Sequence, residues 1–171
     1  MSIIASFYLV RIEDVAKLKY LAKQPVGFTS RKFLWIKFKT HQWHDPFWNH
    51  LHEKTQELGK FNWSGSAMLA VDYFLESSLI ELSGFTDQEL TDYFSKTRGS
   101  GNLVFNREGA VRLRETIARL NPTPESIEEF LDSTKEIPED MPLQAFVDGV
   151  TILTDWLSQV DDSCVGLLHI G

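Results

Sequence analysis

Four of the five histidines fall within twelve consecutive positions, a density at which imidazole rings can bind a transition metal or move protons near neutral pH. They are His41, His44, His50 and His52. On a helix, His50 and His52 would point about 200° away from each other, so they could not chelate one ion together. His50 and Glu53 form a better same-face pair, but Gln56 stands where the zincin pattern requires its second histidine. The spacing therefore predicts no metal site and no cofactor, and histidines that are solvated or at an interface.

Tryptophan is concentrated in the same part of the chain, where four of the five tryptophans lie between positions 35 and 63. Large aromatic side chains fill the core of a small protein, but tryptophan is also enriched at the centres of protein interfaces. Trp43 stands between polar neighbours in a segment expected to be a loop, where burial is hard to arrange. For these tryptophans as a group we expect core packing. The position of Trp43 favours the alternative, an exposed binding patch. The candidate binding residues of such a patch are Trp43, His44, Trp48, His50, His52, Glu53 and Trp63.

No sequence motif for nucleotide binding or nucleophilic catalysis is complete. The segment 98–102 contains two glycines but has the spacing of neither a Walker loop nor a dinucleotide fingerprint. Ser64 and Ser66 lack the glycine pattern of a nucleophile elbow. Cys164 lies in an apolar segment, where a buried thiol is expected rather than a nucleophile. No catalytic residue is assigned, and binding is favoured over catalysis.

Composition and charge predict one folded domain over residues 1–171. The chain is 43% apolar and 12% aromatic, which exceeds what a disordered sequence carries. Twenty-four acidic and seventeen basic residues give a net charge of −7, which repels phosphate backbones and anionic lipid headgroups. The single cysteine and the short apolar runs are typical of a cytoplasmic protein. We expect neither nucleic acid nor a membrane as partner, and a basic protein as the partner that this charge would attract.

Hydrophobic periodicity places the elements along the chain. Runs of β-branched and aromatic residues or a two-residue alternation predict strands at 3–12, 31–39 and 165–170. Apolar residues three and four apart predict helices at 13–23, 46–58, 67–75, 87–98, 111–120, 124–131 and 143–159. Asp45 and Ser66 are the expected N-caps of the second and third helices, Thr86 and Glu89 suggest a capping box for the fourth, and Gly59 is the expected stop of the second. The segment 102–105 is too short to assign.

Several helices between few strands, without regular strand and helix alternation, predict an α+β fold rather than a doubly wound sheet. The helices should pack on a small mixed or antiparallel sheet that includes the N- and C-terminal strands.

The opening residues Met1 to Ala5 and the closing residues Leu167 to Gly171 resemble the YfbM-like family of small bacterial proteins of unknown function. That family opens with an apolar strand and a short helix and ends with an apolar strand and a glycine. The resemblance covers about the first twenty and the last thirty residues, and Ala5 and Ser6 stand where the family has a glycine. It implies an α+β fold and no known activity or site.

Three functional hypotheses follow from these features. The first is a cytoplasmic protein-binding or regulatory protein, of the immunity type for example, with an acidic surface and an exposed aromatic and histidine patch. The second is a small-molecule or metal-dependent enzyme that uses the histidine-rich segment 41–53. The third is a structural subunit that buries its apolar patch in a symmetric oligomer. The sequence predicts no particular oligomeric state.

Overall fold

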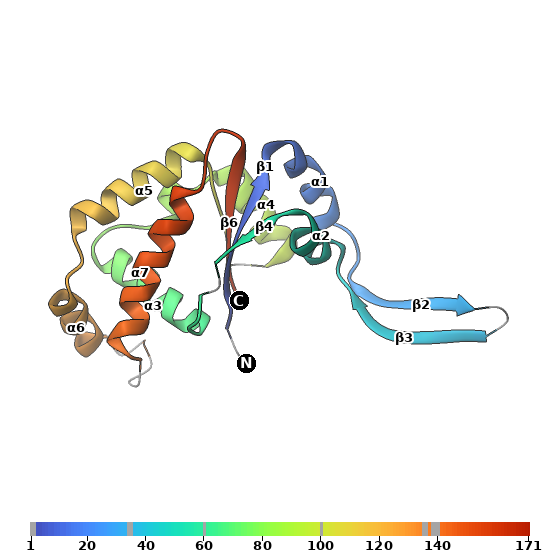
Figure 1. Ribbon diagram of the computed structural model, residues 1–171, viewed down its shortest axis with the longest axis horizontal. Helices are drawn as coiled ribbons and strands as arrows, with labels where there is room; N and C mark the ends of the chain where they lie inside the picture. The colour runs from blue at the N-terminus through green and yellow to red at the C-terminus, as the bar shows by residue number, and fades with distance from the viewer. Residues whose placement is uncertain (1–2, 34–35, 60, 100, 135–136, 138–140) are drawn as a thin grey trace.

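The computed structural model describes residues 3–33, 36–59, 61–99, 101–134, 137 and 141–171 (Figure 1). Trp35 lies outside the described residues, and so do the side chains of residues 28–43, which include His41 and Trp43. The described strands are β1 (Ala5–Arg11), β2 (Gly27–Phe33), β3 (Ile36–His44), β4 (Gln56–Leu58), β5 (Asn102–Phe105) and β6 (Cys164–Ile170). The described helices are α1 (Ile12–Ala22), α2 (Pro46–Lys54), α3 (Gly65–Ser77), α4 (Gln88–Arg98), α5 (Arg107–Leu120), α6 (Pro124–Ser133), α7 (Leu143–Ser158) and the 3-10 turn η1 (Leu82–Phe85). Among the described helices, none is both long and apolar enough to cross a bilayer.

The main sheet has four antiparallel strands in the order β4-β1-β6-β5. β1 and β6 form its centre and pair along their whole length, from Ala5 opposite Ile170 to Arg11 opposite Cys164. The helices pack on this sheet, and the predicted α+β class with both the first and the last strand in the sheet is confirmed. The strand expected at 165–170 is therefore correct, and the unassigned segment 102–105 forms the edge strand β5.

Alternate residues of the central strands face two separate hydrophobic clusters. Phe7 and Leu168 join a cluster with α3, α5 and α7, and we call this side of the sheet the α7 face. Tyr8 and Leu167 join a second cluster with α1, α2 and α4, and we call this side the α2 face. Because successive side chains of a strand point to opposite sides, β1 and β6 supply apolar residues to both faces. The sheet is thus the central layer between two groups of helices.

β2 and β3 form a separate two-stranded antiparallel hairpin that extends away from the helices and the main sheet (Figure 1). The single strand expected at 31–39 is wrong, because this segment contains the end of β2 and the start of β3. Apolar and polar residues alternate from Ile36 to Lys39 in β3, but residues 29–32 of β2 are all polar, so a two-residue period does not identify β2 as a separate strand. Trp43 was expected in a loop, but its backbone belongs to β3 and pairs with Phe28.

The second helix is shorter than expected. Asp45 caps α2 and Pro46 is its first residue, as predicted. The helix ends at Lys54 rather than before Gly59, because Thr55 is extended and its hydroxyl donates to the carbonyl of Leu51 at 2.6 Å. The next three residues form β4, which pairs with β1 as an edge strand and closes one side of the sheet.

Two helices begin at other residues than those expected. The N-cap of α3 is Ser64 rather than Ser66, because Gly65 already starts the helix and its amide donates to the carbonyl of Ile3 at 2.8 Å. A Cβ atom on Gly65 would lie 2.6 Å from the Ile3 side chain, so this close contact requires glycine. The N-cap of α4 is Asp87, whose carboxylate accepts from the amide of Leu90 at 3.1 Å, so the capping box expected from Thr86 is not the cap.

Candidate functional site

Four rings meet at one end of the α2 face, and we call Tyr8, Trp48, His52 and His169 the ring cluster. The centroid of Trp48 lies 4.6 Å from that of His169 and 6.2 Å from those of Tyr8 and His52. Tyr8 is buried, Trp48 is half-buried and His52 is exposed, so the cluster reaches from the sheet to solvent. Sequence reasoning selected Trp48 and His52 but missed Tyr8 and His169, because only the pairing of β1 with β6 brings these two beneath α2.

His169 is held by a buried asparagine on the neighbouring strand. Nδ1 of His169 lies 3.1 Å from Oδ1 of Asn102, and the amide nitrogen of Asn102 donates to the carbonyl of Gly99 at 2.8 Å. Since that amide nitrogen is the donor to Gly99, the amide oxygen accepts from an Nδ1–H group and Nε2 keeps its lone pair. Burial lowers the pKa of His169, which favours the neutral ring. The arrangement can therefore offer a neutral imidazole as an acceptor.

The exposed side of the ring cluster carries polar groups. The hydroxyl of Ser6 donates to Oε1 of Glu57 at 3.3 Å, and Nδ1 of His52 lies 3.9 Å from Oε2 of the same carboxylate. Burial raises the pKa of Tyr8 and the charge of Glu57 adds to this rise, whereas a hydrogen bond with Ser6 acts in the opposite direction. Aromatic area with polar groups at its border is the composition of many protein contact sites.

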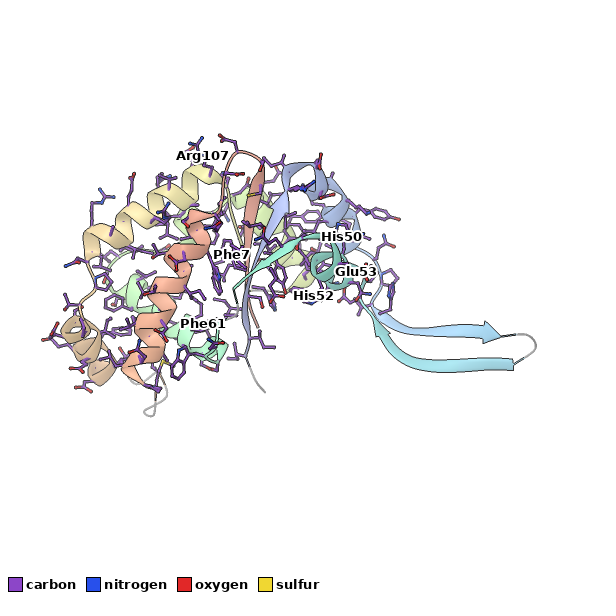
Figure 2. All side chains as sticks on the ribbon, viewed as in Figure 1. Phe7, His50, His52, Glu53, Phe61 and Arg107 are labelled. Carbon is purple, nitrogen blue, oxygen red and sulfur yellow. The ribbon has the colours of Figure 1, made fainter. Side chains whose placement is uncertain are left out.

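The other predicted histidines do not join the ring cluster. His44 ends β3, and its Nδ1 lies 3.0 Å from the side-chain amide of Asn49. His50 is buried where α2 packs on α1, and its pKa is lowered by burial and then by a nearby lysine of α1. Figure 2 shows His50 and His52 leaving α2 in different directions, in agreement with the divergence expected for these two residues. Within the described residues, no three histidine, cysteine or acidic side chains are grouped so as to hold a metal ion.

The start of α2 is fixed to α4 by a buried ion pair. The carboxylate of Asp45 accepts from the amides of Phe47 at 3.1 Å and Trp48 at 3.3 Å, and it also binds the guanidinium of Arg98. Both charged side chains are buried, and the guanidinium lies 4.8 Å from the centre of the Phe47 ring. Because Asp45 directly follows β3, these contacts also fix the base of the hairpin.

Trp63 lies on the other side of the sheet, away from the ring cluster. Its indole N–H donates to Oδ2 of Asp148 on α7 at 2.8 Å, and Gln144 donates to the other oxygen at 2.7 Å. These two hydrogen bonds lower the pKa of Asp148, with that of Trp63 the larger. A hollow of about 240 Å³ beside Trp63 is also lined by Phe61 and Asp155, and we call it the Trp63 hollow. The seven candidate residues are therefore divided among separate places.

Charge is distributed unevenly between the hairpin and the rest of the chain. Residues 27–44 contain four basic residues, Arg31, Lys32, Lys37 and Lys39, and no acidic residue. The remaining 13 basic and 24 acidic residues have a net charge of −11. Sequence reasoning missed this division because it considered the net charge of the whole chain, although a count along the sequence reveals it.

No protein-family model, characterised protein or solved structure matches this chain. The resemblance to the YfbM-like family therefore stays a prediction.

Proposed function

We propose that the protein is a protein-binding protein whose contact element is the β2–β3 hairpin, extended by the ring cluster at its base. The observation that carries this proposal is the projection of the hairpin from the rest of the molecule (Figure 1). In the described part of the chain, no helix or further strand packs extensively on it. A two-stranded hairpin is at best marginally stable alone, and its open edges can pair with another chain. A partner would add contacts to those that the two strands make with each other.

The base of the hairpin supports this role. Trp48 is in the first turn of α2, directly after β3, and His52 lies one turn further along. The ion pair of Asp45 with Arg98 holds this turn against α4. A hairpin whose base is fixed loses less conformational freedom on binding than a hairpin whose base is free to move.

Charge favours an acidic surface as the partner of the hairpin itself. The four basic residues of the hairpin would attract such a surface and speed its association. The basic partner expected from the net charge is better matched by α6 and α7, which carry the exposed acidic residues Glu125, Glu128, Glu129, Asp132 and Asp155. A regulatory or immunity-type role in the cytoplasm, where a lone thiol such as Cys164 stays reduced, completes this proposal.

Shortening the hairpin tests the proposal. Because Phe28 pairs with Trp43, replacing residues 29–42 by an asparagine and a glycine closes the ladder with a two-residue turn. We expect proteins that the full chain captures in near-stoichiometric amount from host lysate to be lost with the shortened chain. The control Glu115→Lys/Ala118→Lys, on the exposed side of α5, should capture them as before. Equal capture by the shortened chain would contradict the proposal.

A second candidate function, an enzyme acting on a small molecule, is favoured by the hydrogen bond of His169 to Asn102. It leaves a neutral imidazole beside Trp48 that could accept a proton. NMR signals of the His169 ring should then shift when a small-molecule extract of the host is added, and the shift should be absent in Asn102→Ala. An unchanged His169 spectrum would remove this candidate.

A further inference from the structure

We infer that the Trp63 hollow, together with the exposed acidic sides of α6 and α7, binds the basic hairpin of a second copy of this chain. The inference rests on the proposed function, since it names a partner for the same hairpin. It assigns to the opposite end of the molecule a surface that complements the hairpin in charge.

The receiving surface is acidic. Residues 124–158 contain nine acidic residues and one basic residue. The exposed acidic residues of the two helices are Glu125, Glu128, Glu129, Asp132 and Asp155. The ion pairs of the described residues all lie outside α6 and α7. A basic partner would therefore bring countercharge where the described chain brings none.

The Trp63 hollow has the chemistry to receive a basic side chain. Phe61 and Trp63 supply aromatic surface, which attracts cations through the negative face of the ring. Asp148 and Asp155 supply carboxylates in the same hollow, and Thr151 completes its polar wall. The volume of about 240 Å³ is small for a drug-sized ligand and suits one or two side chains.

The hairpin carries paired basic residues that an acidic surface would complement. In its ladder Lys32 stands opposite Lys37, and Lys39 stands opposite Ser30. Like charges directly opposite each other destabilise a strand pair. An acidic surface alongside the ladder would bring countercharge to these positions, so we expect docking to stabilise the hairpin as well as the complex.

The arrangement of the molecule makes the contact intermolecular. In Figure 1 the hairpin extends from the side of α1 and α2, whereas α6 and α7 lie at the far side of the sheet. The hairpin of one copy therefore cannot reach its own α7, but it can reach that of a neighbour. Repetition of this contact from copy to copy gives a closed ring or an open chain. If two copies each bind the hairpin of the other, they form a dimer.

Sedimentation velocity of the full chain with two charge variants tests the inference. The hairpin variant is Lys32→Glu/Lys37→Glu, and the hollow variant is Thr151→Lys/Asp155→Lys, which keeps the hydrogen bond of Trp63 to Asp148. We expect the wild type to associate with rising concentration at about 0.01 M salt and to dissociate at about 1 M salt, where charges are screened beyond about 3 Å. Each variant alone should weaken association more than tenfold. Circular dichroism of both variants controls for folding.

Mixing the two variants provides the decisive comparison. In the mixture, the unchanged basic hairpin of the hollow variant meets the unchanged Trp63 hollow of the hairpin variant, so the mixture should associate at low salt. The control Glu115→Lys/Ala118→Lys has the same change in charge as the hollow variant and should associate like the wild type. A wild type that stays monomeric, or a mixture that does not associate, would overturn the inference. If the copies do not associate but the hairpin is still needed to capture another protein, only the inference about a second copy is contradicted. If shortening the hairpin also leaves capture unchanged, the proposed function is contradicted as well.

Discussion

The protonation of His169 depends on the main sheet. Sequence spacing could identify the histidines near α2, but it could not connect them with position 169, which is more than one hundred residues away. The connection arises because Ser6, His169 and Asn102 occupy one row across β1, β6 and β5. Residue chemistry at this site is therefore a consequence of strand register, which a single sequence does not reveal.

The lowered pKa of His169 predicts a pH dependence of stability. Between the folded pKa and the ordinary value of about 6.5, the unfolded chain binds a proton that the folded chain does not. The free energy of unfolding should therefore fall as pH drops through about 6.5, and the fall should be less steep in His169→Gln. Urea unfolding between pH 7.5 and about 5 measures both slopes. An NMR titration that places the pKa of His169 above 6.5 would contradict the prediction.

The raised pKa of Asp72 on α3 predicts the opposite pH dependence of the free energy of unfolding. Burial, with a smaller effect from Glu76, raises the pKa of Asp72 to about 6. A carboxyl group whose pKa is raised destabilises the folded chain above that pKa, and the penalty disappears as pH falls toward 4. Asp72→Asn should stabilise by on the order of 1 kcal/mol at pH 7, after allowance for solvent screening, and by almost nothing at pH 4. Urea unfolding at the two pH values tests this, and equal effects at both would contradict it.

At the scale of the element, α2 and the hairpin show what periodicity can and cannot predict. Asp45 and Pro46 are local signals that act within one turn, and the start of α2 is where they indicate. The end of α2 depends on β4 pairing with β1, which lies more than forty residues earlier in the chain. The hairpin was missed because residues 29–32 of β2 are all polar, so only the alternation at the start of β3 indicated a strand. Local caps were therefore predictable, while strand pairing was not.

The buried ion pair at the start of α2 predicts a large and specific loss of stability. Arg98→Met leaves the carboxylate of Asp45 buried without its partner and should cost about 3–5 kcal/mol. Asp45→Asn in the same chain keeps an N-cap and should restore part of the loss. Arg107→Met is the control, because the ion pair of Arg107 with Asp162 is exposed and should cost less than about 1 kcal/mol. Urea unfolding measures all three, and an Arg98→Met variant within about 1 kcal/mol of the wild type would contradict this account.

At the scale of the whole molecule, the net charge of −7 conceals two ends of opposite character. The prediction of an acidic surface and a basic partner considered only the sum. The described structure separates a basic hairpin from acidic helices, and the proposals of binding through the hairpin and of association between copies rest on this separation. The α+β fold could be predicted from the pattern of elements, but the projecting arm could not.

Site-specific photo-crosslinking in the native host tests the central claim most directly. A photoreactive amino acid at position 30, in β2, should crosslink to another protein chain, whereas the same group at position 115, on the exposed side of α5, should not. Identification of the crosslinked chain by mass spectrometry shows whether it is a second copy or a different protein. Crosslinking at position 30 above that at position 115 is the predicted result. Equal or absent crosslinking at position 30 would contradict the claim that the hairpin is the contact element.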